Sequence, residues 1–469
     1  MIEKLAELYR YFPTIPSPKY ALSLKEKILW SVAILVVYFL MMHTVVIGVK
    51  HTNTQMDLLS IIVASRAGTL LTLGIGPIII ASLLLQLLIG GGVVNFKLDS
   101  PEKRKIFAEA QVVVAVILAL IQAYLYAYGA IGPTATGPYV SEAFYGNPIT
   151  MHLVALQIVL GAIFVIYLDQ ISTKYGLTSG ISLFIAAGVS YAVVSGALYI
   201  LFNEDVGIIS QFLKGVGIEA LQTALVQIIP LITTAIAIYV ITWIQSMKVS
   251  IPLTIMGQDR KIELPFFYLT TIPVIFASIF LLMLYQLGLS LLQIPGEDLL
   301  AQIARFIGAI LYVLGPLPAN HYNIPSYLNT VFSGTVPVLG IPEWLHLIIH
   351  IIVLGITSMI FGVLWAETMG QDGKSLAKQL RQYPQVQVQG YRRDPRILEK
   401  KIVEYVDPLI KLSSLVIGLL AGIGDALAVL GTGTGILLTI SIYERMLPQI
   451  REAIKIYAPQ LAGLLGEKV

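Results

Sequence analysis

The histidines of the sequence form one pattern that could hold a metal ion. His346 and His350 lie four residues apart with Glu343 just before them, a spacing that can place metal ligands on one side of a helix. The His-Glu-x-x-His order of a zinc-protease helix is absent, and the three residues stand at the end of an apolar run. We therefore expect these side chains to pack at a helix end, without a metal.

A glycine-rich run forms a second chemical pattern. Gly431, Gly433 and Gly435 resemble a phosphate-binding loop, but such a loop follows a strand and ends in a lysine, and this run has neither feature. Close packing between helices is the better interpretation. The chain has no cysteine, which excludes disulfides, thiolate nucleophiles and iron–sulfur sites. Without a nucleotide motif or a nucleophile–base pair, the sequence predicts a protein that is not an enzyme and needs no cofactor.

One carboxylate, Asp425, stands within an apolar run near its end. An ionisable residue inside a membrane span is a candidate for ion or proton coupling. A second unusual feature is the break at Gly74–Pro77, because irregular backbone at membrane depth is tolerated only where it faces protein or a water-filled cavity. Together these features permit one interpretation, an ion-coupled secondary transporter whose site comprises Asp425 and the broken helix. An intramembrane protease is a further alternative, but no catalytic set supports it.

The composition places these residues in a membrane protein. Of the 469 residues, 57% are hydrophobic and 12% are charged, and the mean hydropathy is +0.82. A soluble domain has about 25% charged residues. Roughly half of the charge that a water-facing surface needs is missing, so most of the surface must face lipid.

Apolar runs of about 20 residues, the length of a membrane-spanning helix, divide the chain into ten predicted spans. They are residues 28–48, 74–94, 106–128, 151–168, 180–201, 219–243, 266–288, 343–366, 408–430 and 433–450. The stretches 56–66 and 299–317 are shorter or contain charges, and we interpret them as re-entrant or interfacial. The sequence therefore predicts an all-α polytopic membrane protein with ten transmembrane helices.

The basic residues orient these spans. With ten spans both termini share one side, and 26 of the 30 Lys and Arg residues fall on that side. Because positive charge is retained in the cytoplasm, both termini are expected to be cytoplasmic, in a multi-pass protein of the cell membrane. Ten spans also divide into two halves of five with opposite orientations, residues 1–201 and 202–469, which predicts two inverted pseudo-symmetric halves.

Several blocks, in order along the chain, resemble the SecY family, the pore-forming alpha subunits of the protein-conducting translocon, in its archaeal form. The blocks are ASRAGTLLTLGIGPIIIASLLLQLLIGGG at 64–92, YLDQISTKYGLTSGISLFIAAGVS at 167–190, WAETMGQDGKSLAKQL at 365–380, GYRRDP at 390–395 and GTGTGILLTISIYER at 431–445. The resemblance implies a channel that passes unfolded secretory polypeptides across the membrane and releases transmembrane segments sideways into the lipid bilayer.

The resemblance also implies a pore ring and a plug. The positions that match the family's ring are Ile75, Ile79, Ile181, Ile185, Ile275 and Leu438. All are aliphatic, as a seal that closes by excluding water requires, whereas a transporter needs polar groups at the midplane. The plug helix matches residues 56–67, with Asp57, Leu58, Leu59, Ile61, Ile62, Ser65 and Arg66 as its candidate residues.

A lateral gate and a ribosome-docking surface follow from the same resemblance. Gln122 matches the polar pattern of the gate, and the matching positions Ile80 and Met283 are apolar. Gln86 or Gln286 is a candidate to compensate. The docking loops are residues 244–265 and 367–407, with Lys248, Arg260, Lys261, Arg392, Arg393 and Arg396 as the candidate contacts to ribosomal RNA phosphates. The expected partners are a SecE-like gamma subunit, a small beta subunit, the translating ribosome, and signal peptides and nascent chains.

Overall fold

The computed structural model describes residues 2–49, 64–94, 96, 100–131, 148–203, 207–214, 225–255, 258–269, 271–296, 298–317, 324–381, 386–388 and 395–457. Each of the ten predicted spans overlaps a described helix. These are α2 (Leu24–His43), α4 (Gly76–Gly90), α5 (Pro101–Ile131), α6 (Pro148–Tyr175), α7 (Gly180–Phe202), α10 (Ile229–Gln245), α11 (Ile272–Leu292), α14 (Glu343–Met369), α16 (Pro395–Ala426) and α17 (Gly433–Tyr457).

Seven of the described helices are long and apolar enough to cross a membrane by length and composition: α5, α6, α7, α10, α11, α14 and α16. Of the remaining three, α4 is only 15 residues long, and the second half of α17 carries charged residues. The exposed apolar side chains agree with a lipid environment. On α14, Ile348, Ile352, Ile356 and Ile360 form an exposed stripe with a spacing of four residues, which is one face of a helix.

Local sequence signals set several helix ends. The side chain of Ser23 accepts a hydrogen bond from the backbone N–H of Glu26, and the Glu26 side chain accepts from the N–H of Ser23, so α2 begins with a capping box. Ser179 caps α7 by accepting from the N–H of Ser182. Gly370 ends α14 in the left-handed conformation, at φ +65°, where glycine has no steric penalty.

The break that the sequence predicts at Gly74–Pro77, in the second span, is present. Residues 64–75 form turns, Gly74 adopts φ +51°, and α4 starts only at Gly76 with Pro77 in its first turn. The segment packs on α6 at Gly161, where an added Cβ would stand 2.2 Å from the carbonyl oxygen of Leu70. Glycine at position 161 thus allows the irregular segment to approach the helix closely.

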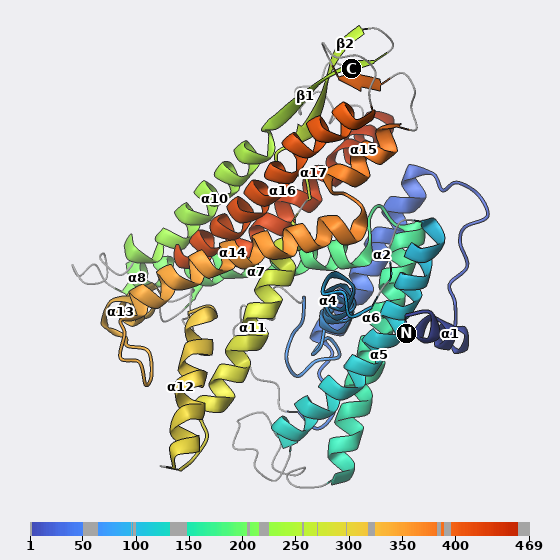
Figure 1. The fold of residues 1–469 in the computed structure, drawn as a ribbon. Helices are drawn as coiled ribbons and strands as arrows, with labels where there is room; N and C mark the ends of the chain where they lie inside the picture. The colour runs from blue at the N-terminus through green and yellow to red at the C-terminus, as the bar shows by residue number, and fades with distance from the viewer. Residues whose placement is uncertain are drawn as a thin grey trace.

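The described helices form two groups around a shared core. Figure 1 shows α1 (Ile2–Leu8), α2, α5 and α6 on one side of the molecule and α10, α14, α16 and α17 on the other. The largest hydrophobic cluster joins both groups, with Tyr38 of α2, Phe184 of α7, Phe276 of α11 and Leu437 of α17 among its buried members. All six predicted ring residues belong to this cluster or pack against it.

A small sheet is an addition to the helical fold that the sequence interpretation did not include. Strand β1 (Lys248–Ile255) pairs antiparallel with β2 (Gln258–Pro265) and with β3 (Val386–Val388), in the order β2-β1-β3. Figure 1 shows β1 and β2 projecting beyond the long helices, beside α15 (Gly373–Arg381). The predicted loop 367–407 therefore contains a helix, a strand and the first turns of α16. A hydrophobic cluster around Ile251, Ala377 and Ile402 holds β1, α15 and the first turns of α16 together.

Four short helices complete the described structure. They are the 3-10 helix η1 (Tyr9–Tyr11), α8 (Ile208–Lys214), α12 (Leu299–Leu314) and α13 (Ile324–Ser333). The stretch that we interpreted as interfacial, 299–317, is mostly α12, which packs along α11 through a close crossing of Gly288 and Gly308.

Candidate functional site

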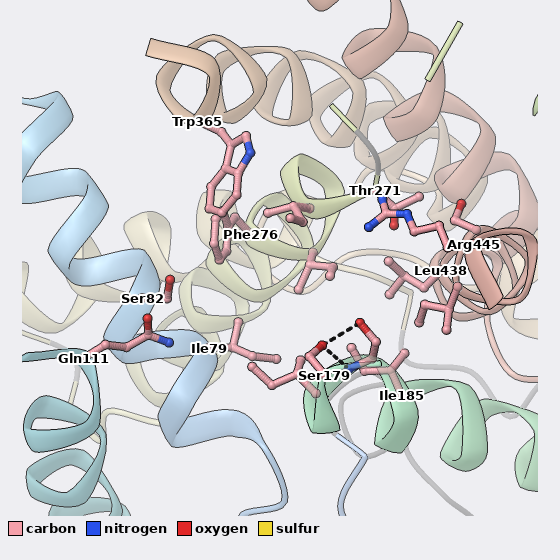
Figure 2. A pocket seen from close by; sticks show the side chains of 16 residues that line it. Ile79, Ser82, Gln111, Ser179, Ile185, Thr271, Phe276, Trp365, Leu438 and Arg445 are labelled. Carbon is pink, nitrogen blue, oxygen red and sulfur yellow. Dashed lines mark hydrogen bonds between the residues drawn. The ribbon is translucent and has the colours of Figure 1, made fainter. Parts of the chain in front are cut away.

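A central cavity of about 200 Å³ lies where the two groups of helices meet. Its wall is built by α4, α5, α7, α11, α14 and α17, so both halves of the chain contribute (Figure 2). The residues that line it are Ile79, Ser82, Gln111, Ser179, Ile181, Ser182, Ile185, Thr271, Ile272, Ile275, Phe276, Trp365, Leu438, Ser441, Ile442 and Arg445.

Five of the six predicted ring residues line this cavity: Ile79, Ile181, Ile185, Ile275 and Leu438. They come from four different helices, α4, α7, α11 and α17, and Ile79, Ile185 and Leu438 are almost completely buried. Ile75, the sixth, is fully buried at the start of α4, one turn before Ile79, and does not line the cavity. The structure thus brings the predicted ring positions together in space, and their role as a seal stays a prediction.

Polar side chains form a second part of the cavity wall, which the sequence interpretation missed. They are Ser82, Gln111, Ser179, Ser182, Thr271 and Ser441. Ser179 and Ser182 bond each other at 3.0 Å, as Figure 2 shows, and Ser441 donates to the carbonyl oxygen of Leu437. These hydroxyls keep lone pairs for water, so one part of the cavity can be wetted while the aliphatic part resists wetting. The hydroxyls lie in the middle of α4, at the beginnings of α7 and α11 and in the middle of α17.

The predicted plug lies mostly outside the described residues, which include only its last members. Asp57, Leu58, Leu59, Ile61 and Ile62 are among the residues not described. Ser65 is buried and Arg66 is half-buried, and the hydroxyl of Tyr38 on α2 donates to the carbonyl oxygen of Ala64 at 3.0 Å.

Ala64 is held close to the ring. A Cβ on Gly188 of α7 would stand 3.5 Å from the Cβ of Ala64, and Gly188 follows the ring residue Ile185 by one turn. The Tyr38 ring stacks on Phe184 with centroids 4.9 Å apart. The chain that leads out of the predicted plug thus lies against α7. It lies on the side of the ring residues, which form the waist of the cavity, that is away from the hydroxyl-lined part.

Two aspartates fix the starts of the two helices that carry three of the ring residues. Asp425, near the end of α16, accepts a hydrogen bond from the N–H of Gly433 at 2.7 Å, at the start of α17. Asp169, in α6, accepts from the N–H of Ile181 at 2.9 Å, at the start of α7. A carboxylate at a helix start satisfies an N–H that has no partner within the helix and suits the positive end of the helix dipole.

Each aspartate sits beside a glycine that permits close contact. An added Cβ on Gly180 would stand 2.4 Å from the Cα of Asp169, and one on Gly433 would stand 2.7 Å from the Cα of Gly424. The glycine run at 431–435 thus serves close helix packing, as we expected. The sequence offers no local signal for the Asp169 contact, because the aspartate reaches a backbone N–H twelve residues away across a turn.

The predicted gate residues lie on three helices. Ile80 and Gln86 are on α4, Gln122 is on α5 and Met283 is on α11. Gln86 is buried and donates to the hydroxyl of Ser82 at 2.9 Å, whereas Met283 is exposed. Near the end of α4, Gly90 approaches Leu364 of α14, where an added Cβ would stand 3.1 Å from Cδ2. The boundary between the two helix groups therefore runs along α4.

The predicted docking residues are distributed over the sheet and α16. Lys248 begins β1 and donates to Glu263 of β2 at 2.8 Å, and this hydrogen bond and the positive charge lower the pKa of Glu263. Arg260 and Lys261 are in β2, and Arg396 is in the first turn of α16. Arg392 and Arg393 lie outside the described residues. Because Lys248 already has a carboxylate partner, it is a weaker phosphate contact than its charge alone suggests.

Three of the four imidazole nitrogens of His346 and His350 have hydrogen-bond partners. His346 contacts Glu343 through Nδ1 at 2.7 Å and the carbonyl oxygen of Gly315 through Nε2 at 3.0 Å. His350 contacts the carbonyl oxygen of Leu314 through Nδ1. The two imidazoles therefore tie α14 to the end of α12, and their nitrogens face separate partners rather than a common point.

Comparison with known proteins gives one consistent family. The family model described as SecY matches residues 69–447. The chain is 34% identical over 478 aligned residues to the protein translocase subunit SecY of Methanocaldococcus jannaschii, covering 99% of this chain and all of that protein. It is 32% identical to the protein of the same description from Pyrococcus furiosus, covering 98% of each.

Solved structures agree with the sequence comparison. The fold is similar to that of a solved protein-conducting channel, with a TM-score of 0.68, 31% identity, and 97% of this chain and 98% of that chain covered. It is also similar to the channel solved in the canine ribosome–channel complex from the endoplasmic reticulum, with a TM-score of 0.65, 30% identity and the same coverage. Ribosome-bound channels are thus among the structures that share this fold.

Proposed function

We propose that this chain, which belongs to the SecY family of protein-conducting channel subunits, lets unfolded polypeptide cross the membrane through its central cavity. The polypeptide would pass between the ring residues that line the cavity, Ile79, Ile181, Ile185, Ile275 and Leu438. The chain is a multi-pass membrane protein and not an enzyme. One observation carries the proposed route. Ring positions from four helices meet in one cavity whose wall changes from hydroxyls to branched aliphatic side chains.

The change from hydroxyls to aliphatic side chains explains how the ring can exclude water and ions at rest and still let a polypeptide pass. Water and ions that enter an aliphatic constriction lose hydrogen bonds that they cannot replace, so the narrow part stays dry at rest. An extended polypeptide can separate the same side chains without meeting a polar group that would bind it. Ile75, buried directly beside Ile79, supports the ring from behind.

The two halves, residues 1–201 and 202–469, are inverted repeats in this proposal, with both termini in the cytoplasm. Their corresponding helix pairs, α6–α7 and α16–α17, support the division. In each pair an aspartate on the first helix accepts from a backbone N–H at the start of the second, and the second helix carries ring residues. The distribution of Lys and Arg supports the orientation of the termini.

Opening sideways would occur along α4, between Ile80 and Gln86 on one side and Met283 of α11 on the other. Separation there exposes the cavity to lipid, so an apolar segment of the passing chain can partition into the bilayer. Because Ile80 and Met283 are apolar, the closed gate would be more hydrophobic than one with polar residues at these two positions. The plug, residues 56–67, is proposed to rest on the far side of the ring, anchored where Tyr38 binds Ala64.

The translating ribosome is the proposed energy source. The loops 244–265 and 367–407, folded together as the β-sheet and α15, place Arg260, Lys261 and Arg396 on one projecting end of the molecule. Such cations suit the phosphates of ribosomal RNA. Small single-span gamma and beta subunits are further proposed partners, which would cover part of the exposed apolar surface.

Replacing Asp425 by Asn separates this proposal from ion-coupled transport. Asn keeps an oxygen that can accept from the N–H of Gly433, so the start of α17 and the channel should be preserved. We expect protease-protected uptake of a signal-bearing preprotein into vesicles to stay within about twofold of wild type, because no step of translocation depends on the charge of Asp425. A proton- or ion-coupled transporter would lose its transport almost entirely.

A matched variant shows whether the hydrogen bond itself matters. Asp425→Leu removes the acceptor and should lower the yield of folded protein, because the N–H of Gly433 is left without its partner. If Asp425→Asn abolishes uptake while the complex still assembles and binds ribosomes, the carboxylate charge is part of the transport mechanism. The proposed channel function would then be wrong.

A further inference from the structure

Arg445 is the one charged side chain among the described residues that line the central cavity. It follows Leu438 on α17 by seven residues, with Ser441 and Ile442 between them, all lining the same space. This spacing of three and four residues places the four side chains on one face of the helix. The Cα of Arg445 therefore lies about 10 Å further along the helix axis than that of Leu438, on the hydroxyl-lined side of the ring residues.

The described residues provide no partner for this cation. Other basic side chains have acidic partners, such as Lys248 with Glu263 and Lys401 with Glu404. No such ion pair involves Arg445 in the part of the chain that the structure describes, and the carboxylate next to it in sequence, Glu444, lines a separate surface hollow with Arg451. Figure 2 shows Arg445 and Leu438 extending from the same helix toward the cavity.

An uncompensated charge has a stronger effect in such a place than on the open surface. The walls around Arg445 include the apolar side chains of Ile272, Phe276 and Trp365, and such low-dielectric walls concentrate the field in the cavity. A polypeptide that enters the cavity must pass the positive charge of Arg445 before it reaches the ring. The cavity is too narrow for a passing side chain to stay beyond the range of that field, because the Debye length at physiological salt is about 8 Å.

We propose that Arg445 makes the channel charge-selective: it favours the entry of chain segments rich in Asp and Glu and retards segments rich in Lys and Arg. This inference rests on the proposed route of the polypeptide through the cavity. It assigns Arg445 a role in discriminating among substrates, separate from the seal that the ring residues make. No bond forms or breaks, and the effect is electrostatic attraction or repulsion during passage.

The test compares three preproteins that differ only in a short block within the mature part, made of lysines, of aspartates or of serines. Ribosome–nascent-chain complexes deliver them to vesicles that contain the purified channel complex, without a membrane potential, and protease protection gives the rate. Wild type should transport the aspartate block faster than the lysine block. Arg445→Gln should lower that ratio about fivefold, as removal of one charge at close range in a partly wet cavity predicts.

Further variants make the outcome specific. Arg445→Glu should invert the preference, and Arg445→Lys should preserve it. Arg451→Gln removes the same charge from the same helix but outside the cavity, so it should leave the ratio at the wild-type value. Higher salt should shrink the wild-type ratio, because the charge is reached by water.

The serine block separates the two levels of the proposal. If wild type does not transport it, the proposed channel function fails. If wild type and Arg445→Gln transport it equally but the ratio of aspartate to lysine rates does not change, the charge selectivity is wrong and the channel function stands. An equal change in Arg451→Gln would also overturn the inference, because the effect would then come from general surface charge.

Discussion

Truncating Ile79, Ile181 and Ile275 to alanine together, in a chain that also lacks residues 56–67, should turn a closed channel into one that conducts ions continuously. The three changes remove about nine carbons from the waist, and at roughly 0.8 kcal/mol per carbon they weaken the dry state by up to about 7 kcal/mol. A tenfold shift from dry to wet needs only about 1.4 kcal/mol. Alanine keeps the helices intact, because it has the highest helix propensity.

Single-channel conductance in planar bilayers measures this effect, with the plug-deleted wild-type ring as baseline. The matched control is Ile352, Ile356 and Ile360 changed to alanine, which removes the same carbons from the exposed stripe of α14. The control should remain tight, and translocation of a preprotein should survive in both variants. If the ring variant stays as tight as the control, these residues pack helices together and do not form the seal.

Reversing the charge of the adjacent pair Arg392 and Arg393 to glutamate should weaken ribosome binding roughly a hundredfold at low salt. Each arginine that contacts a phosphate releases a counterion on binding, so the slope of log affinity against log salt should fall by about two. A salt titration of complex binding to purified ribosomes measures both quantities. The pair Arg104 and Lys105, at the start of α5, is the matched control, and its reversal should change binding little.

An equal loss of affinity in the two pairs would show that any basic surface on this side binds the ribosome. Unchanged affinity in Arg392→Glu/Arg393→Glu would show that the loop does not dock it. Only the specific loss, with a smaller salt slope, agrees with docking through the loop 367–407.

Hydropathy alone was enough to locate the helices of the ten predicted spans, because a span that faces lipid must be apolar over its whole length. The span predicted at 408–430 shows the limit of that criterion. Helix α16 starts at Pro395, but its first turns carry Arg396, Lys400 and Lys401, so composition marks only the part inside the membrane. The strand pairing of Leu253 with Val388 was also beyond prediction, since it joins residues more than a hundred positions apart.

The candidate site, like the fold, could be predicted from the sequence only in part. Resemblance to the SecY family selected the ring positions, which periodicity could not separate from the other aliphatic residues of so apolar a chain. The hydroxyls of Ser82 and Ser441, the contact of Asp169 with α7 and the position of Arg445 depend on how helices from distant parts of the chain meet. For α17 the sequence does carry a signal, because Leu438, Ser441, Ile442 and Arg445 follow one another at the spacings of one helix face.

The most direct test of the central claim, that polypeptide passes through this cavity, uses the absence of cysteine from the chain. Single cysteines replace Ile185 or Leu438 in the ring and, as a control, Ile356 on the lipid-facing stripe, and each is paired with a single cysteine in a preprotein halted during translocation. Oxidation should form disulfides from the halted chain to Cys at positions 185 and 438, and none to position 356. Disulfides only at position 356, or at none of the three while the chain is demonstrably halted across the membrane, would contradict the proposed path.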